Sequence, residues 1–386
     1  MKYVVIAGGG PAGLMAAHVL SQNDTFRVQV FDANKAIARK FLVAGHGGFN
    51  LTNAEATDAF IEKYTHPFIQ NAVRHFSNEE TIQWLSEIGV NTFVGSSGKI
   101  FPEKGIKPIQ VLTKWIGYLE KNGVTIHTEH QLIDFTEGTA VFQHEGKRVA
   151  VEYDYLITAF GGASWKKTGS TGEWTELFIR KNREIIPFQA SNAGIVLAGW
   201  DVGLGGGVLK NTEITIDGVK QFGEIELTDY GLEGAPVYAL SKKIREGATE
   251  LVLNLKPVWT PGRLAEKYAA FSGSKTDFLS AIKVSKPGVK LIKHVLSKEE
   301  FTDDKRFLRA IHHLVLPVEE LRPVDEAIST VGGLSMNEVD ASFQLINSEK
   351  HYCIGEMLDW DAPTGGYLLQ ACFASGYMAA QSVLKL

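Results

Sequence analysis

The chain has 386 residues, of which 44% are hydrophobic and 22% charged, and a net charge of −5 that is spread along the sequence. A chain of this length and composition predicts an ordinary globular protein with two or more domains. We find no basic run and no acidic tail, which argues against a nucleic-acid partner. The two cysteines, Cys353 and Cys372, form no CxxC motif, so we predict no disulfide framework and no metal site.

The first twenty residues, "MKYVVIAGGGPAGLMAAHVL", superficially resemble a signal peptide. Three consecutive glycines and Pro11 would break such an apolar helix, and a strand, turn and helix explain them better. No uninterrupted apolar run reaches the length needed to span a membrane. We therefore expect a soluble, cytoplasmic protein with no membrane contact.

A glycine-rich turn follows the first predicted strand. Residues 3–7, "YVVIA", form a short β-branched apolar run typical of a buried parallel strand. Gly8 permits the tight turn, Gly10 allows the backbone to approach a pyrophosphate, and Gly13 allows the following helix to pack on the strand. The second strand, "RVQVF", ends at Asp32, where a carboxylate can bind ribose hydroxyls. The pattern predicts a dinucleotide site without separating NAD from FAD, and the alternative is a tight turn without a ligand.

Helices and then strands are expected after this motif. Residues 57–89 are helical in character, and residues 107–123 place apolar side chains on one helical face before the stop at Gly123. The segments "HQLIDF", "TAVFQ" and "KRVAVE" predict a small antiparallel meander. Residues 153–160, "YDYLITAF", again have the pattern of a buried parallel strand and run into Gly161 and Gly162.

The character of the sequence changes near Ala190. Strand and turn patterns without α/β alternation predict an inserted β-rich domain of residues 190–260 and 311–324, with a small helical subdomain of residues 261–310. The nucleotide-binding domain would then comprise residues 1–189 and 325–386. The run "VGLGGGV" inside the insertion lacks a following helix and an acidic residue, so we interpret it as a turn.

Six segments occur along the chain in this order: "VVIAGGGPAGLMAA", "ARKFLVAGHGGFNLTN", "FGGASWKKTGSTGEW", "GEIELTDYGLEGAPVYALS", "ISTVGGLSMNEVD" and "GEMLDWDAPTGGYLLQACFASG". Together they resemble the BaiN-type flavoproteins, which are aminoacetone-oxidase-like NAD(P)/FAD-dependent oxidoreductases. The resemblance covers essentially the whole chain. It implies an α/β fold with a glutathione-reductase-type, Rossmann-like FAD-binding domain, an inserted β domain and a small helical cap.

The resemblance also implies which residues contact FAD. Asp32 would bind the adenosine ribose, Leu132 would meet adenine through its backbone, and Glu356 would meet the ribityl region. The start of the last helix would stabilise negative charge on the flavin ring. Phe160 stands where the family has threonine, which puts that contact in doubt. The remaining contacts outside the first loop are Gly8, Gly10, Pro11, Ala12, Gly13, Ala159, Gly161, Gly162, Gly355, Gly365, Gly366, Tyr367 and Leu368.

The loop of residues 38–53 is expected to wrap the ribityl chain and the edge of the isoalloxazine ring. Its glycines would let the backbone pass close to a flat ring, its polar side chains would supply hydrogen bonds, and its two cations would hold phosphate or ring oxygens. The contacts expected from this loop come from Arg39, Lys40, Gly45, Gly47, Gly48, Asn50, Leu51, Thr52 and Asn53.

Two residues are candidates for proton transfer. His46 titrates near neutral pH and belongs to the cofactor loop, while the alternative is that it only bonds the loop or faces solvent. Tyr367 is expected to stack on the isoalloxazine ring or to donate a proton. The alternative is that it is only a packing residue. Paired carboxylates can act as general acid and base in enzymes. For Glu356, Asp359 and Asp361 we favour a different interpretation, in which they cap the last helix or bind ribityl hydroxyls. The "TGSTG" run is expected either to line the substrate side of the site or to cap a helix. Both cysteines are expected to be chemically inert packing residues.

The sequence predicts an FAD-dependent oxidoreductase that takes hydride from NAD(P)H and reduces a small organic acceptor, with an activated C=C bond as one candidate. Since no second nucleotide motif is present, NAD(P)H would dock transiently. Two alternatives stay open. The first is an oxidase of a small amine that uses O₂, and the second is a flavin-binding RNA-modifying or regulatory protein, against which the charge balance counts.

Overall fold

The computed structural model describes residues 1–43 and 48–386. These residues divide into two compact units, with residues 1–189 and 329–386 in unit 1 and residues 190–328 in unit 2. The predicted nucleotide-binding domain contains unit 1 and, in addition, residues 325–328. A two-stranded sheet of β11 (Ile185–Ser191) and β18 (Ser329–Leu334) lies where the chain leaves and re-enters unit 1.

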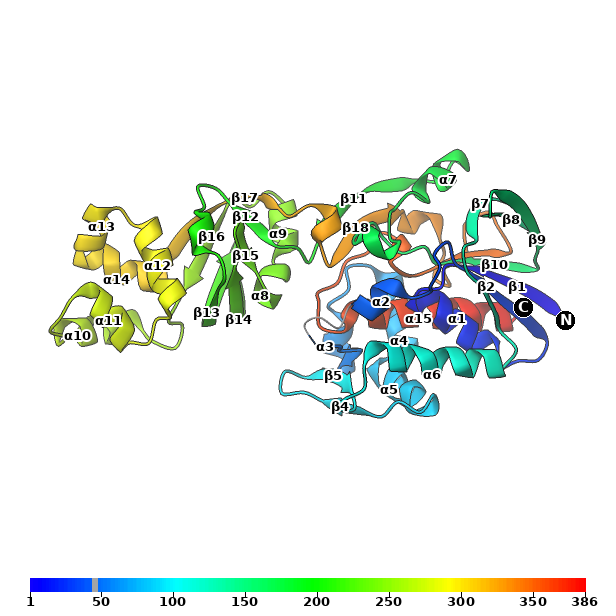
Figure 1. Ribbon diagram of the computed structural model, residues 1–386, viewed down its shortest axis with the longest axis horizontal. Helices are drawn as coiled ribbons and strands as arrows, with labels where there is room; N and C mark the ends of the chain where they lie inside the picture. Colours follow the sequence, from blue (N-terminus) through cyan, green and yellow to red (C-terminus); the bar gives the residue numbers. More distant parts are fainter. Residues whose placement is uncertain (44–47) are drawn as a thin grey trace. The chain divides into compact units, whose positions relative to one another are not determined.

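A five-stranded parallel sheet forms the centre of unit 1 (Figure 1). Its order is β19–β10–β1–β2–β6, so the first strand lies in the middle and strands distant in sequence lie beside it. All four residues of β10 are buried, as expected for a strand covered on both faces. The strands are β1 (Lys2–Ala7), β2 (Phe26–Phe31), β6 (Thr125–His127), β10 (Tyr155–Thr158) and β19 (His351–Cys353).

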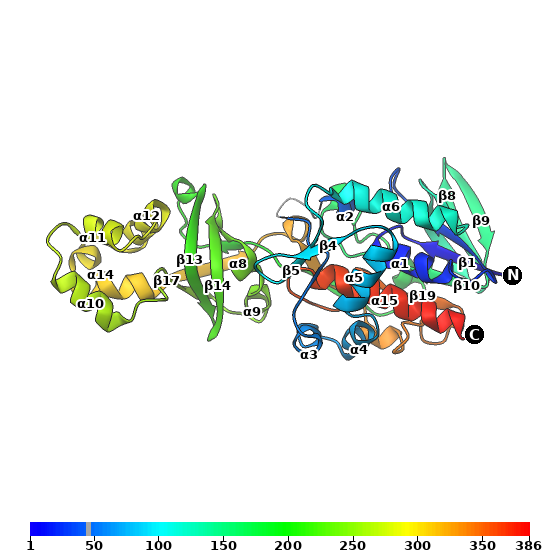
Figure 2. The same cartoon turned by 90° about the horizontal axis from the view of Figure 1, so that it is seen from below.

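Two buried helices lie side by side in unit 1 (Figures 1 and 2). Helix α1 (Pro11–Leu20) connects β1 to β2, and α15 (Tyr367–Leu384) is the last helix of the chain. Their contact is close at Gly376, where a Cβ would lie 2.3 Å from the Ala12 carbonyl oxygen. This contact fixes the start of α1 against the C-terminal segment.

The predicted antiparallel meander is confirmed. Strands β7 (Gln131–Thr136), β8 (Thr139–His144) and β9 (Lys147–Glu152) pair in sequence order. Phe142 of β8 stacks on Phe31 of β2, with ring centroids 4.3 Å apart. The meander therefore packs against the end of β2, where Asp32 follows.

The other elements of unit 1 surround the sheet. The region predicted as helical over residues 57–89 contains three helices, because Pro67 and the capping residue Ser77 each begin a new one. These elements are α2 (Arg39–Val43), β3 (Thr52–Asn53), α3 (Thr57–Ile61), α4 (Pro67–His75), α5 (Asn78–Glu87), β4 (Thr92–Val94), β5 (Lys99–Pro102), α6 (Pro108–Lys121), η1 (Lys166–Thr168), α7 (Thr175–Arg180), η4 (Met336–Glu338) and η5 (Gly355–Met357).

Unit 2 is built on a closed six-stranded antiparallel barrel. Alternate residues of its strands point inward, and Ile214, Ile225 and Leu253 are fully buried in its core. The barrel order is β12 (Ile195–Leu197), β15 (Gly231–Glu233), β14 (Val219–Leu227), β13 (Gly207–Ile216), β16 (Glu250–Asn254) and β17 (Leu314–Leu321). The "VGLGGGV" run forms the short η2 (Val202–Leu204) and the start of β13, in agreement with a turn in a β domain.

Helices α8 (Ala235–Tyr238) and α9 (Ser241–Arg245) lie between β15 and β16 in the sequence of unit 2. Five further short helices lie between β16 and β17 in the sequence, and each begins at a Ser, Thr or Asp cap. Phe278, Leu291 and Phe307 from these helices are buried in the same hydrophobic core as the barrel residues. The predicted helical subdomain therefore shares its core with the β-rich domain. The helices are α10 (Pro261–Ala269), α11 (Lys275–Ala281), α12 (Lys286–Val295), α13 (Lys298–Thr302) and α14 (Asp304–His312).

Among residues 1–43 and 48–386, no helix is both long enough and apolar enough to cross a membrane.

Candidate functional site

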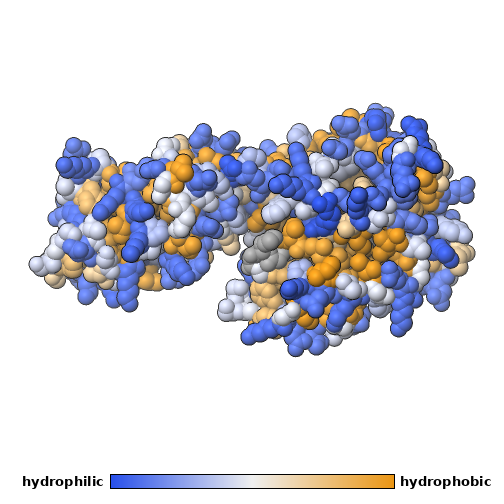
Figure 3. All heavy atoms as spheres, viewed as in Figure 1, coloured by the Kyte–Doolittle hydropathy of each residue, from blue (hydrophilic) through white to orange (hydrophobic). Residues whose placement is uncertain are grey.

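A cleft in unit 1 opens at the ends of β1, β2 and β10, beside the start of α1. Carboxyl ends of parallel strands are where open α/β sheets bind nucleotides. Figure 3 shows apolar side chains gathered over the part of unit 1 where α1, α2 and α15 lie in Figure 1. The residues predicted to bind the cofactor that line this cleft are Gly8, Gly10, Pro11, Ala12, Asp32, Arg39, Lys40, Leu132, Ala159, Gly161, Gly355 and Glu356.

The start of α1 presents free backbone N–H groups to the cleft. Gly10 is the cap residue, and no side chain bonds to the first turn that it opens. A Cβ at Gly10 would meet no atom within 4 Å, whereas a Cβ at Gly8, where φ is +116°, would lie 2.2 Å from the Ala159 carbonyl oxygen. Gly13 does not line the cleft, because a Cβ there would lie 2.1 Å from the Gly8 carbonyl oxygen. Gly8 and Gly13 therefore shape the turn, while Gly10 leaves space for a ligand.

Asp32 connects the end of β2 to the glycine-rich turn. Its Oδ2 accepts a hydrogen bond from the Gly9 N–H at 2.9 Å, and its Oδ1 accepts from the Asn34 N–H at 2.8 Å and from Asn34 Nδ2 at 3.0 Å. Two carboxylate oxygens accept about four hydrogen bonds in total. Asp32 thus holds the turn in place and keeps acceptor capacity for a ribose hydroxyl.

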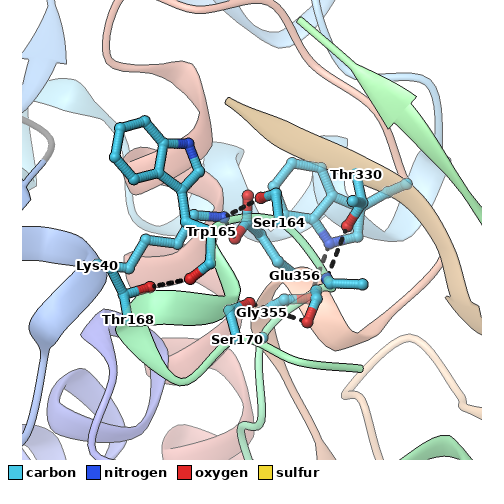
Figure 4. Close-up of polar contacts among 12 residues, drawn as sticks. Lys40, Ser164, Trp165, Thr168, Ser170, Thr330, Gly355 and Glu356 are labelled. Carbon is cyan, nitrogen blue, oxygen red and sulfur yellow. Dashed lines mark hydrogen bonds and ion pairs between the residues drawn. The ribbon is translucent and has the colours of Figure 1, made fainter. Parts of the chain in front are cut away.

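Lys40 and Glu356 form an ion pair on the cleft wall (Figure 4). Lys40 Nζ lies 3.0 Å from Glu356 Oε2 and donates to Ser164 Oγ at 2.8 Å. The side chains are 27% and 12% exposed, so the pair is partly shielded from water. It joins α2, the loop after β10 and η5 in one polar cluster.

Arg39 closes the other side of the same cleft. Its guanidinium donates to the Lys167 carbonyl oxygen at 2.5 Å and to Asn34 Oδ1 at 3.1 Å. Asn34 in turn donates to Asp32, so the Arg39 guanidinium and the Asp32 carboxylate are positioned through one amide side chain. Arg39 therefore ties the loop that contains η1 to the end of β2.

The side chains of Thr330, Ser170 and Trp174 hydrogen-bond to the loop after β10. Figure 4 shows Thr330 and Ser170 beside this loop. Ser170 Oγ donates to the Gly162 carbonyl oxygen at 2.9 Å, and Trp174 Nε1 donates to the Gly161 carbonyl oxygen at 3.0 Å. A Cβ at Gly162 would lie 2.1 Å from Thr330 Oγ1, so Gly162 is a packing residue and does not line the cleft. Phe160 lines the cleft in place of the family's threonine.

Gly355 brings the C-terminal segment to the start of α1. A Cβ at Gly355 would lie 2.9 Å from the Ala12 Cβ, and the φ of Gly355 is +78°. Its N–H donates to Ser375 Oγ at 3.1 Å, and its carbonyl accepts from Trp360 Nε1 at 2.9 Å. Segments from both ends of the chain therefore line one cleft.

The residues at the start of α15 do not line the cleft among the described residues. Gly365, Gly366, Tyr367 and Leu368 pack instead beside β3 and its neighbours, and a Cβ at Gly366 would lie 2.5 Å from the Thr52 backbone. Tyr367 Oη donates to Glu55 Oε2 at 2.7 Å. Burial, together with this carboxylate, raises the pKa of Tyr367 well above its usual value. Its proton is therefore held in a structural contact.

The polar residues at the end of the loop of residues 38–53 also make internal contacts. Thr52 Oγ1 donates to Gln370 Oε1 at 2.8 Å, and Asn53 Oδ1 accepts from the Glu55 N–H at 3.0 Å. Leu51 is fully buried, and Gly48 and Asn50 do not line the cleft. Thr52 thus connects β3 to α15 rather than pointing into the cleft. Gly45, His46 and Gly47 lie outside the described residues.

The three C-terminal acids have separate roles. Only Glu356 lines the cleft. Asp359 Oδ1 accepts from the Gly332 N–H at 2.8 Å, and Asp361 Oδ1 accepts from the Ala362 N–H at 3.0 Å. Within the described part of the chain, no group of three His, Cys, Asp or Glu residues is placed to hold a metal ion.

Both cysteines are buried. Burial raises the pKa of Cys353 to about 12 and raises the pKa of Cys372 further, so neither thiol ionises near neutral pH. Cys372 nevertheless lines the cleft, one turn into α15. The inert role that the sequence suggested fits these pKa shifts, but the sequence analysis did not place Cys372 at the site.

Several other lining residues were missed by the sequence analysis. For the run "TGSTG" the sequence left open the substrate side or a helix cap, and in the structure Thr168 to Thr171 border the same cleft as Asp32. A signal was available, because these residues belong to the segment that resembles the flavoprotein family. The missed lining residues are Phe31, Ala33, Asn34, Ala36, Phe41, His130, Gln131, Glu173, Trp174, Ile354 and Cys372.

The cleft residues fit the adenosine diphosphate part of FAD. The uncapped start of α1 and the open space at Gly10 suit a pyrophosphate, because backbone N–H groups and the helix dipole favour anions there. Asp32 suits a ribose, and Leu132 borders the place for the adenine. Lys40 and Glu356 lie where the cleft continues toward the C-terminal segment.

Comparisons with known proteins agree with this architecture. The 3-dehydro-bile acid delta(4,6)-reductase of Clostridium scindens is 25% identical over 412 aligned residues that cover 100% of both chains. The ribosomal RNA dihydrouridine synthase of Haemophilus influenzae is 25% identical over 403 residues, covering 99% of this chain and 98% of the relative. The solved 3-ketosteroid-delta4-(5alpha)-dehydrogenase of Rhodococcus jostii RHA1 shares the fold, with a TM-score of 0.55 at 14% identity over 100% of this chain and 97% of that chain.

The family model described as "HI0933-like protein Rossmann domain" matches residues 2–382. This match confirms the family resemblance and the Rossmann-type fold predicted from the sequence. The chain belongs to the HI0933-like Rossmann-domain family.

Proposed function

We propose that this enzyme, an FAD-dependent oxidoreductase, takes hydride from NAD(P)H and reduces a C=C bond conjugated to a carbonyl group in a small organic acceptor. The observation that carries the proposal is the cleft in which the start of α1, Asp32 and the Lys40–Glu356 pair line one continuous surface. FAD, when bound there, would supply the hydride-transfer chemistry, and the protein supplies position and electrostatics.

The chain's own residues would hold the cofactor in three places. The N–H groups of the first turn of α1 would bind the pyrophosphate, since they have no side-chain cap. Asp32 would accept a ribose hydroxyl while it keeps its bond to the Gly9 N–H. Lys40 would place a positive charge near the phosphate and ribityl region, with Glu356 fixing its position.

The acceptor class is supported by two relatives. Their names describe a delta(4,6)-reductase of a 3-dehydro-bile acid and a dihydrouridine synthase. Both reactions saturate a C=C bond that is conjugated to a carbonyl, in a ring ketone in one case and in a uracil ring in the other. Each relative aligns with nearly the whole of this chain, so the shared part of their chemistry is the basis for the proposal.

NAD(P)H is proposed as a donor that docks transiently. The sequence has one dinucleotide motif, and Gly8, Gly10 and Asp32 of this motif line the cleft that we propose for FAD. A tightly bound nicotinamide dinucleotide is commonly held by a second motif of the same kind. A donor that enters, transfers hydride and leaves requires none.

The test is anaerobic reduction followed by acceptor addition. Purified protein is expected to show a flavin absorption spectrum that is bleached by NADPH or NADH and restored by an enone such as cyclohexenone. Absence of bound flavin together with no affinity for added FAD would refute the proposal. Bleaching by a small amine but not by a nicotinamide, with O₂ consumption in air, would instead support the oxidase alternative.

A further inference from the structure

We propose that the exposed face of helix α12 in unit 2 is a docking surface for the phosphate backbone of RNA. The surface is defined by Lys286, Lys290 and Lys293, with Lys283 just before the helix. The inference goes beyond the proposed function and does not depend on it, because it concerns a surface of unit 2 and not the cofactor cleft.

The sequence around α12 has an uneven charge distribution. Between Asp277 and Glu299 the chain contains the lysines 283, 286, 290, 293 and 298 and no acidic residue. The net charge of −5 for the whole chain conceals this segment. The sequence contains no run of consecutive basic residues, and we therefore predicted no nucleic-acid partner, but lysines at this spacing form a cationic surface once the segment is helical.

The helix places its cations on one face. Residues 286, 290 and 293 follow i, i+4, i+7 spacing, so their side chains lie along one stripe of an α-helix. All three lysines are exposed. Gly288, Leu291 and Ile292 are buried and form the opposite face, which packs into the core of unit 2. Because the opposite face is packed in the core, the three lysines of the stripe face solvent.

These lysines are not neutralised by neighbouring acids. In the described part of the chain, Lys283, Lys286, Lys290 and Lys293 take part in no ion pair within 4.0 Å. The nearby acids have other partners, since Asp304 pairs with Lys275 at 2.7 Å and Glu300 pairs with Arg306 at 3.2 Å. The positive charge of the stripe is therefore available to an external anion.

Lys256 holds the segment just before this helix. Lys256 Nζ donates to the Lys283 carbonyl oxygen at 2.8 Å. Burial, and to a smaller extent the charge of Lys283, lowers the pKa of Lys256, so Lys256 is not counted as part of the basic surface.

The chemistry of the face favours RNA over a membrane surface. A helix that binds bilayers inserts an exposed apolar face, but the apolar face of α12 is buried in the core of unit 2. A row of lysines without acids matches a regularly charged polyanion, to which such contacts bind mainly by releasing counterions. RNA is the polyanion that the comparisons favour, since a relative of nearly full length is named a ribosomal RNA dihydrouridine synthase.

The experiment uses the full-length holoprotein and a fluorescent uridine-rich RNA of about 20 nucleotides, with anisotropy measured over a series of salt concentrations. Wild-type protein is expected to bind with an affinity that falls as salt rises. A triple variant that combines Lys286→Gln, Lys290→Gln and Lys293→Gln should bind the RNA roughly tenfold or more weakly. The slope of log K against log salt concentration should become shallower by about 2, or ~0.7 for each lost phosphate contact. Glutamine preserves helix propensity, so α12 should remain folded.

The matched control combines Lys104→Gln, Lys121→Gln and Lys147→Gln, which remove the same charge from exposed positions of unit 1. This control should bind RNA within about twofold of wild type. Flavin reduction by NADPH should be unchanged in both variants, which separates a failure of this inference from a failure of the proposed function. No binding by wild type, equal losses in both variants, or binding only to vesicles that contain phosphatidylserine would overturn the inference.

Discussion

Lys40 Nζ lies 3.0 Å from Glu356 Oε2, and this ion pair joins two residues separated by 316 positions in the sequence. The pair connects α2 to η5 on the wall of the cleft, and the Glu356 side chain is only 12% exposed. A charge with so little contact with water depends on its partner more than a surface charge does. The first prediction follows from this dependence.

Lys40→Met should weaken FAD binding by roughly tenfold or more and lower the free energy of unfolding of the apoprotein by about 1–2 kcal/mol. The expected cause is that Glu356 loses both its hydrogen-bond partner and its counter-charge. FAD titration and urea unfolding measure the two effects. The control is Lys35→Met, since Lys35 lies 3.9 Å from Glu129 with side chains 88% and 51% exposed. Equal effects of both substitutions would show that the Lys40–Glu356 pair has no special role.

Gly8 and Gly10 should respond differently to the same added methyl group. Gly8→Ala should destabilise the apoprotein by about 2 kcal/mol or more, because its Cβ would lie 2.2 Å from the Ala159 carbonyl oxygen at a φ of +116°. Gly10→Ala should leave stability within about 1 kcal/mol, since its Cβ meets nothing within 4 Å. It should nevertheless weaken FAD binding, because the methyl group enters the pyrophosphate space. Unchanged FAD affinity in Gly10→Ala would place the pyrophosphate elsewhere.

Tyr367→Phe tests whether Tyr367 is catalytic. The hydroxyl donates to Glu55 Oε2 at 2.7 Å, so we expect turnover with NADPH and an enone within about threefold of wild type. The free energy of unfolding should fall by about 1 kcal/mol, the usual contribution of such a hydrogen bond. Steady-state kinetics and urea unfolding provide the readouts. A loss of turnover of 100-fold or more with normal FAD binding would restore Tyr367 as a proton donor.

His18 should make stability depend on pH. Burial lowers the pKa of His18 from 6.5 to about 4, and its ring stacks on Tyr118 at 4.5 Å between centroids. The unfolded chain therefore binds a proton that the folded chain excludes, so stability is complete above pH 6.5 and falls as pH decreases toward 4. The loss from this residue is about 3 kcal/mol. His18→Phe should reduce the pH dependence over this range, and an unchanged slope would show that His18 does not contribute.

The nucleotide-binding half of the fold was predictable because its signals are local. The strand before Gly8, the helix after Gly13 and the acid at Asp32 lie within one short segment, and each has a separate physical role. The meander of β7, β8 and β9 was equally visible as three alternating runs bounded by turns. Patterns of this kind depend only on neighbours in sequence.

Contacts between distant segments could not be predicted in the same way. Thr52 was expected to bind the cofactor, yet its hydroxyl donates to Gln370, 318 positions away. Tyr367 likewise finds Glu55 at a separation of 312 positions. A polar residue in a loop shows that a partner is needed, but the sequence alone does not show which one. The same limit explains why the closure of the barrel in unit 2 was not predicted.

The most direct test of the account is a crystal structure of the protein with FAD. We predict that the pyrophosphate lies beside Gly10 and within hydrogen-bond distance of the Ala12 N–H group, with the ribose at Asp32 and the cofactor extending past Lys40 toward Gly355. Electron density for FAD away from the glycine-rich turn, or an adenosine ribose with no contact to Asp32, would contradict it.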